Sequence, residues 1–288
     1  MHIKNPVEWF FAQLEATAEA TAIVGGTSAD EYWSHLPADR LPDVQKIGVA
    51  DVKAAMKQGL EDFFAARTDV IFLCLIYPVI GIFLAVVTGR GGLLPLLFPV
   101  ASGFALLGPF FAIGLYEMSR RREQGARVGW ANAFDVFQAP AVAGIAALGV
   151  ILVVLFLTWL AVAWGIFEVT MGPVAPAAPM AFLHDVFFTT GGREMIVIGM
   201  GAGFLFALLA MCLSVVSFPL LLDRDVGLDT AIAASFQAVR ANPAPMALWG
   251  LIVAGTLLIG TAFAFVGLVV AVPVLGHATW HLYRKLVG

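Results

Sequence analysis

Four ionisable residues near the ends of apolar segments have types and spacings that could support metal or proton chemistry. His277 and His281 are four residues apart, which places both imidazoles on one face of a helix. That spacing can present two nitrogen ligands to one metal ion. Glu117 and Asp223 follow two earlier apolar segments and could add carboxylate ligands. The four residues are therefore candidates for a divalent-metal site or a proton relay, because ionisable groups at membrane depth are often functional.

A structural interpretation competes with the chemical one, and we favour it. All four candidates lie within a turn or two of an expected headgroup region, where ionisable side chains are tolerated and pair with one another. Arg120, Arg224 and Arg284 are suitable partners close by in the sequence. We therefore expect an interfacial ion-pair network, and we assign no catalytic residue, no cofactor and no firm metal ligand.

The elements that must position these residues are membrane helices. Hydrophobic residues make up 60% of the 288-residue chain and charged residues only 12%, against about a quarter charged in average soluble domains. Residues 241–283 carry no formal charge if both histidines are neutral. One helix of that length would be roughly 64 Å long, about twice the hydrocarbon thickness of a bilayer. We therefore expect two spans there, joined by a turn near Gly267.

The fold class predicted from uncharged runs is all-α, a polytopic membrane protein with six transmembrane helices in three hairpins. The predicted spans are residues 70–89, 91–117, 138–167, 195–222, 245–265 and 267–283. If both termini are cytoplasmic, 14 of the 16 Lys and Arg residues lie on the cytoplasmic side. The two exceptions are Arg90 and Arg193. A five-span count would move Arg284 and Lys285 outward, so the charges also favour six.

Polar and amphipathic segments complete the predicted organisation. Residues 1–48 form a cytoplasmic N-terminal extension, and residues 49–288 form the membrane domain. Within the extension, Asn5-Pro6 is a typical helix start. The polar side of this helix is acidic, which disfavours binding to anionic lipid. We expect it to dock on the protein's own cytoplasmic face or on a membrane-protein partner.

Further amphipathic segments precede three of the spans. One is a helix of about residues 51–66 that leads into the first span, and two shorter segments begin at Val128 and Val226. Each combines an apolar side at helical spacing with a polar side. We expect all three to lie on the cytoplasmic face.

The even-numbered spans end in similar sequences, which suggests a threefold internal repeat. The three ends read FALLGPFFAIGLYEMSRRRE, SVVSFPLLLDRD and AVPVLGHATWHLYRKL. An alignment on the prolines places Glu117 at the depth of His281, and Asp223 at the depth of His277. Parallel repeats of this kind would surround a central space. The alternative is that aromatic and basic residues commonly flank membrane helices without any repeat.

The expected partner and the motifs that the sequence lacks exclude several classes of function. The lipid bilayer is the expected partner. The sequence has no basic patch with interleaved aromatic residues, so we expect no nucleic-acid binding. It also has no Gly-rich phosphate loop and no Cys pair at metal-ligand spacing.

Five blocks of sequence resemble one bacterial family of integral membrane proteins, domain of unknown function 2189. The blocks are RTDVIFLCLIYP, GLYEMSRRRE, SVVSFPLLLDRD, MALWGLIVAG and PVLGHATWHLYRKL, and the similarity runs from about Val49 to the end. The resemblance implies a bacterial inner-membrane location and no established activity. It carries over no functional residues, because the family has none assigned.

Three hypotheses follow for function. The first is a non-enzymatic accessory, assembly or scaffold protein, indicated by the docking-type extension and the lack of a catalytic constellation. The second is a carrier or channel for a small neutral or amphipathic solute, indicated by the threefold pattern and the prolines within the spans. The third is a metal-dependent membrane enzyme that uses the four ionisable candidates.

Overall fold

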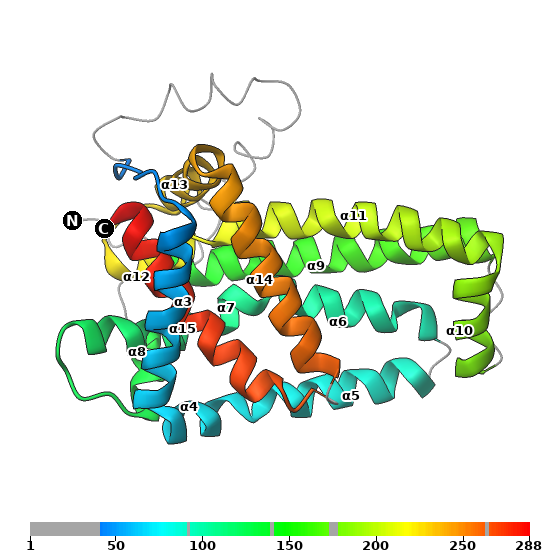
Figure 1. Ribbon diagram of the computed structural model, residues 1–288, viewed down its shortest axis with the longest axis horizontal. Helices are drawn as coiled ribbons and strands as arrows, with labels where there is room; N and C mark the ends of the chain where they lie inside the picture. Colours follow the sequence, from blue (N-terminus) through cyan, green and yellow to red (C-terminus); the bar gives the residue numbers. More distant parts are fainter. Residues whose placement is uncertain (1–40, 91–92, 139–140, 173–177, 263–264) are drawn as a thin grey trace, which may run out of the picture.

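The computed structural model describes residues 41–90, 93–138, 141–172, 178–262 and 265–288, and no strand occurs within these ranges (Figure 1). The helix predicted near Asn5 lies outside the described residues. In chain order the elements are α3 (Val49–Ala65), α4 (Arg67–Cys74), α5 (Ile76–Arg90), the 3₁₀ helix η1 (Leu94–Leu96), α6 (Leu97–Leu106), α7 (Gly108–Phe111), α8 (Ile113–Glu123), the 3₁₀ helix η2 (Trp130–Gln138), α9 (Val142–Met171), α10 (Pro179–Phe188), α11 (Thr190–Ser214), α12 (Ser217–Asp223), α13 (Leu228–Ala241), α14 (Pro243–Ala262) and α15 (Leu268–Val287).

Three helices are long and apolar enough to cross a membrane. They are α9, the continuous pair α11–α12 and α14, and they overlap the third, fourth and fifth predicted spans. A fourth crossing results if α3 and residues 69–84 are counted together as one span bent by 96°. The described part of the chain is therefore all-helical, with three or four candidate membrane spans.

The other predicted spans fall on shorter or less apolar helices. The first corresponds to α4–α5, the second to the series η1 to α8, and the sixth to α15. Within the part of the chain that the structure describes, none of these passes the same requirement by itself. The count of six crossings and the three hairpins therefore stay predictions.

Prolines account for the breaks in the apolar segments. A proline lacks the amide hydrogen of a helical residue and clashes with the carbonyl one turn earlier. The second predicted span breaks before Pro109, between α6 and α7, and α11 gives way to α12 just before Pro219. At the second break the amide of Val216 donates to Ser235 Oγ of α13 at 3.2 Å. A neighbouring helix thus satisfies a backbone group that the break releases.

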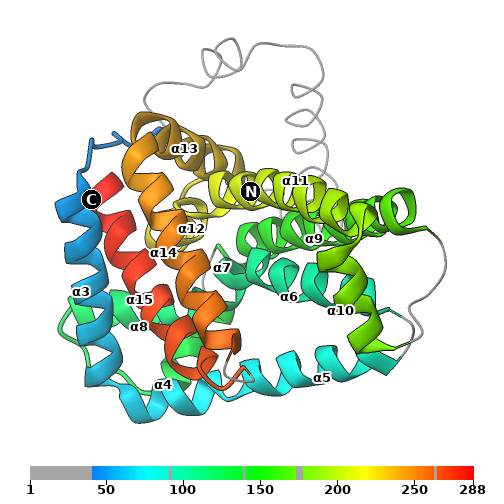
Figure 2. The ribbon, with the colours of Figure 1, turned by 45° about the vertical axis from the view of Figure 1, so that its right-hand side comes forward.

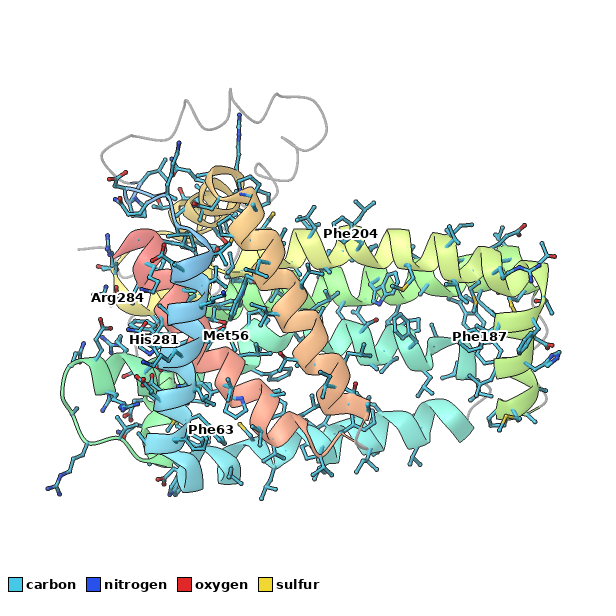
Figure 3. The ribbon with its side chains drawn as sticks, viewed as in Figure 1. Met56, Phe63, Phe187, Phe204, His281 and Arg284 are labelled. Carbon is cyan, nitrogen blue, oxygen red and sulfur yellow. The ribbon has the colours of Figure 1, made fainter. Side chains whose placement is uncertain are left out.

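The helices are arranged around one long axis. Helices α9 and α11 pack side by side along it, and α3 lies across one end, beside α15 (Figures 1 and 2). We call the end formed by α3, α8, α12 and the last turns of α15 the polar end. The opposite end is formed by α10, α5 and the adjoining parts of α9 and α11. It carries exposed charged residues such as Arg193 and Glu194, but no buried one among the described residues, and we call it the apolar end. Nitrogen and oxygen atoms gather around His281 and Arg284 at the polar end (Figure 3).

The contact between α3 and α15 depends on a glycine. A Cβ placed on Gly59 would lie 2.5 Å from the backbone nitrogen of Ala278, which is closer than real Cβ contacts. Large side chains are buried close by, since Tyr116, Trp280 and Tyr283 are at most 1% exposed. The densest part of the core therefore lies at the polar end.

Candidate functional site

The polar residues named from the sequence lie where helices from distant parts of the chain meet. Helix α15 packs against both α3 and α8, and α12 packs against α8 and α15. The ends of the three even-numbered predicted spans therefore lie together, with α3 across them. The last turn of α8 carries Arg120, Arg121 and Arg122, a placement that the helix dipole favours.

Asp62 of α3 is the centre of a polar network, which we define as Asp62, Ser119, Arg122, His277 and His281; Asp62, Ser119 and His277 are buried. The Asp62 carboxylate is 7% exposed. Its Oδ2 accepts from Ser119 Oγ at 2.5 Å and lies 2.9 Å from Nε2 of His281. Its Oδ1 accepts from the guanidinium of Arg122. One carboxylate thus connects α3 to α8 and α15.

The hydrogen bonds of this network determine the proton position on His277. A carboxylate paired with an arginine only accepts hydrogen bonds, so Ser119 must donate its hydroxyl hydrogen to Asp62. The same hydroxyl lies 2.8 Å from Nδ1 of His277, and its oxygen therefore accepts from an Nδ1–H group. Nε2 of His277 is then an acceptor, and it is buried without a hydrogen-bond partner among the described residues.

The network contains the residue types of a Ser-His-Asp triad with the opposite proton arrangement. In a catalytic triad the histidine accepts the hydrogen of the serine hydroxyl. Here His277 donates to Ser119, and Asp62 takes the hydroxyl hydrogen directly. Ser119 is only 1% exposed, which leaves no approach for a substrate carbonyl. The arrangement is that of a structural hydrogen-bond network.

Glu117 forms a second group, within α8. It is 2% exposed, and its two carboxylate oxygens accept from Nε and Nη2 of Arg120 at 2.8 and 3.2 Å and from Nε of Arg121 at 2.6 Å. These hydrogen bonds raise the pKa of the Arg120 guanidinium, against the opposing effect of burial. Arg121 also forms an ion pair with Asp135 of η2, in which Nη2 lies 2.9 Å from Oδ2. The group attaches η2 to the end of α8.

Asp223 forms a third group, at the end of α12. Its Oδ2 accepts from the hydroxyl of Tyr283 at 2.7 Å and from Nη1 of Arg284 at 3.3 Å. Nε of Arg284 also donates to Glu123 at 3.1 Å, and so does the indole of Trp280. The last turns of α15 are thereby joined to both α12 and α8.

The hydrogen bonds of the four candidates fall into three groups, although Glu117 and Asp223 line one cavity. His277 and His281 share a network with Asp62, Glu117 pairs within α8, and Asp223 pairs with α15. Among the described residues, no group of three or more His, Cys, Asp or Glu side chains is placed to hold a metal ion. The equal depth of Glu117 and His281, and of Asp223 and His277, stays a prediction of the repeat alignment.

Sequence reasoning missed the central residue, Asp62. The available signal was its position on the apolar side of α3, since it follows Ala55 by seven residues and Gly59 by three. Helical residues at these spacings share a face, and both Ala55 and Gly59 are buried. An acidic residue on a buried stripe requires a partner. Ser119 and Glu123 gave no comparable signal.

A polar cavity of about 590 Å³ lies beside the Glu117 group. Its charged lining residues are Arg120, Arg121, Arg224, Glu117, Asp135, Asp223 and Asp225, and its apolar ones are Val136, Ala141, Leu221 and Leu222. The cavity therefore lies between the end of α8, η2, the start of α9 and the end of α12. We call it the arginine–carboxylate cavity.

The fold and the site together define an integral membrane protein whose described buried polar residues lie toward one end. A comparison with protein families agrees. The family model described as "Predicted integral membrane protein (DUF2189)" matches residues 97–223, which confirms the family resemblance. No curated protein matches the chain, and no solved structure does. The matched region contains Glu117, Ser119 and Asp223 but neither Asp62 nor the two histidines.

Proposed function

We propose that the protein is a non-enzymatic scaffold of the bacterial inner membrane, an accessory or assembly factor for another membrane protein. The observation that carries the proposal is the use of the polar groups at the polar end. Asp62, Glu117 and Asp223 each bind cationic side chains, and the bonds of Asp62 and Asp223 connect separate helices. Carboxylates that bind cationic side chains in this way hold helices together and are not directed at a substrate.

The exposed apolar surface supports the same proposal. Val197 and Phe204 of α11 are 72% and 66% exposed, and Leu251 of α14 is 72% exposed. Side chains of this kind on long apolar helices suit contact with lipid or with another membrane helix. A scaffold requires such a surface, and the described charged residues do not interrupt it along the middle of α9 and α11.

The proposed topology has six crossings, with both termini in the cytoplasm and the polar end facing that compartment. It is supported by the arginines that follow the three even-numbered predicted spans, because cationic residues near membrane helices favour the cytoplasmic side. Tags at each terminus, probed in intact and opened cells with a membrane-impermeant reagent, test it. Labelling of both tags only after the cells are opened agrees with the proposal. Labelling of one tag in intact cells contradicts it.

The scaffold role is tested by isolating the full-length protein from its native membrane in a mild detergent after cross-linking in cells. We expect one membrane protein to be recovered in a constant ratio to the chain. A second preparation without residues 1–40 should still reach the membrane and should lose that partner, since the helix predicted near Asn5 is the proposed docking element. Repeated recovery of the chain alone would argue against the proposal.

A further inference from the structure

The arginine–carboxylate cavity lies at the depth where two candidate spans end. Ala141 directly precedes α9, and Leu221 and Leu222 belong to the last turn of α12. Both are ends of helices that are long and apolar enough to cross the membrane. The hydrocarbon layer stops where such segments stop. A cavity bordered by both ends therefore lies at the level of the lipid headgroups.

Helix η2 gives independent support for this depth. Its Asp135 and Val136 line the cavity, while Trp130, Phe134 and Phe137 are 47%, 49% and 72% exposed. The three aromatic rings contact one another in sequence along η2. Exposed aromatic side chains are typical of the membrane–water interface. One short helix thus borders the cavity and carries an aromatic stripe suited to the interface.

The polar lining of the cavity suits a ligand that carries both charges. Three guanidinium groups face four carboxylates among the described lining residues, an excess of one negative charge. Arg120 and Arg121 use Nε and Nη2 toward Glu117 and Asp135, so Nη1 of each can donate to a further acceptor. Asp225 has no ion pair or hydrogen bond with the described part of the chain, and it can accept from a cation.

We propose that this cavity binds the headgroup of a phospholipid that carries a primary amine, such as phosphatidylethanolamine. The phosphate binds near the Nη1 groups of Arg120 and Arg121, and the ammonium binds Asp225. The volume of about 590 Å³ lies within the range of roughly 300–1,000 Å³ that is usual for small-molecule sites. This inference is independent of the scaffold role proposed above.

The lining also predicts which headgroups bind poorly. No aromatic side chain is among the described residues that line the cavity, whereas quaternary ammonium groups are usually held by aromatic faces. A choline headgroup also has no N–H group for the carboxylates. An anionic headgroup without an amine, such as phosphatidylglycerol, can bind the arginines, but the net negative charge of the lining repels it. Phosphatidylethanolamine should therefore bind most tightly of the three.

The test uses native mass spectrometry of the full-length protein in detergent, titrated with the three lipids at identical acyl chains. Phosphatidylethanolamine should bind most tightly, and phosphatidylglycerol and phosphatidylcholine should both bind more weakly. In Asp225→Asn the affinity for phosphatidylethanolamine should fall about tenfold, as expected from the loss of one charge-assisted hydrogen bond. Affinity for phosphatidylglycerol should stay equal or rise. Asp229→Asn, an exposed carboxylate at the start of α13, is the matched control and should bind like the unmodified protein.

Three outcomes would overturn the inference. The first is equal binding of phosphatidylglycerol and phosphatidylethanolamine by the unmodified protein. The second is that Asp225→Asn and Asp229→Asn show the same preference among the three lipids, while both variants keep the thermal midpoint of the unmodified protein. The third is displacement of the lipid by soluble glycerophosphoethanolamine at concentrations equal to those of the lipid, because the ligand would then be a soluble phosphate ester. Displacement only at much higher concentrations supports a lipid ligand.

Discussion

The polar end and the apolar end of this protein are held together in different ways. At the polar end, hydrogen bonds and ion pairs connect α3, α8, α12 and α15, and the large side chains are buried. Toward the apolar end, side chains such as Phe187 of α10 and Phe204 of α11 are mostly exposed (Figure 3). Described polar contacts there are mostly local, such as Thr158 Oγ1 to the carbonyl of Val154. Stability should therefore respond to point substitutions at the polar end and much less at the apolar end.

Among substitutions of polar residues, the largest effect is expected from Asp62→Ala. The substitution removes the shared acceptor of Ser119, His281 and Arg122. Loss of one member of a buried ion-pair network should lower the free energy of unfolding by about 3 kcal/mol. Thermal unfolding in detergent measures the change. Glu61→Ala is the control, because Glu61 is exposed and its one ion pair with the described residues is to Lys57, at 3.8 Å. That pair should contribute no more than about 0.5 kcal/mol. Equal losses in the two variants would show that the Asp62 network does not stabilise the polar end.

The second prediction compares glycines at the two ends. Gly59→Ala places a Cβ against the backbone of Ala278, and overpacking of this kind costs about 1–3 kcal/mol. Gly199→Ala in α11 adds a Cβ that has no atom of the described residues within 4 Å. That change should be neutral or stabilising by up to about 1 kcal/mol, since alanine is the better helix former. A stabilised Gly59→Ala variant would show that α3 does not pack closely on α15.

The third prediction concerns one hydrogen bond of the polar end. Tyr283→Phe removes the hydroxyl that donates to Asp223 at 2.7 Å and keeps the buried ring. The loss should be about 1–2 kcal/mol, because the acceptor is charged. In a double-mutant cycle, the effect of Tyr283→Phe should vanish in an Asp223→Ala background, which lacks the acceptor. An unchanged effect without the carboxylate would assign the loss to packing.

The smallest effect is expected on the exposed apolar surface of α11. Phe204→Ala in α11 removes a side chain that is 66% exposed, and substitutions of this kind usually change stability by less than about 0.5 kcal/mol. The measurement is thermal unfolding in the same detergent. The matched substitution at the polar end is Phe218→Ala in α12, whose ring is fully buried, and it should cost about 3–5 kcal/mol. A large loss for Phe204→Ala would show that this face packs against another copy or partner.

The sequence alone determined the features that depend on neighbouring residues. Length and apolar composition identified the segments that became α9, α11–α12 and α14, because spanning a bilayer is a property of one continuous segment. Helical periodicity also anticipated α3 and α13, whose buried residues recur at the expected spacing. The class of integral membrane protein and the family resemblance follow from the same local information.

Only the tertiary structure decided which polar groups meet. Asp62 binds His281 across 219 positions of the chain, and Asp223 binds Tyr283 across 60. Their partners depend on the angle at which α3 crosses the ends of α8 and α15, and no local pattern specifies that angle. The sequence placed Glu117, Asp223 and the two histidines at similar depths, but depth alone does not determine the direction in which a side chain points. For that reason the candidates for one metal site became members of three separate groups.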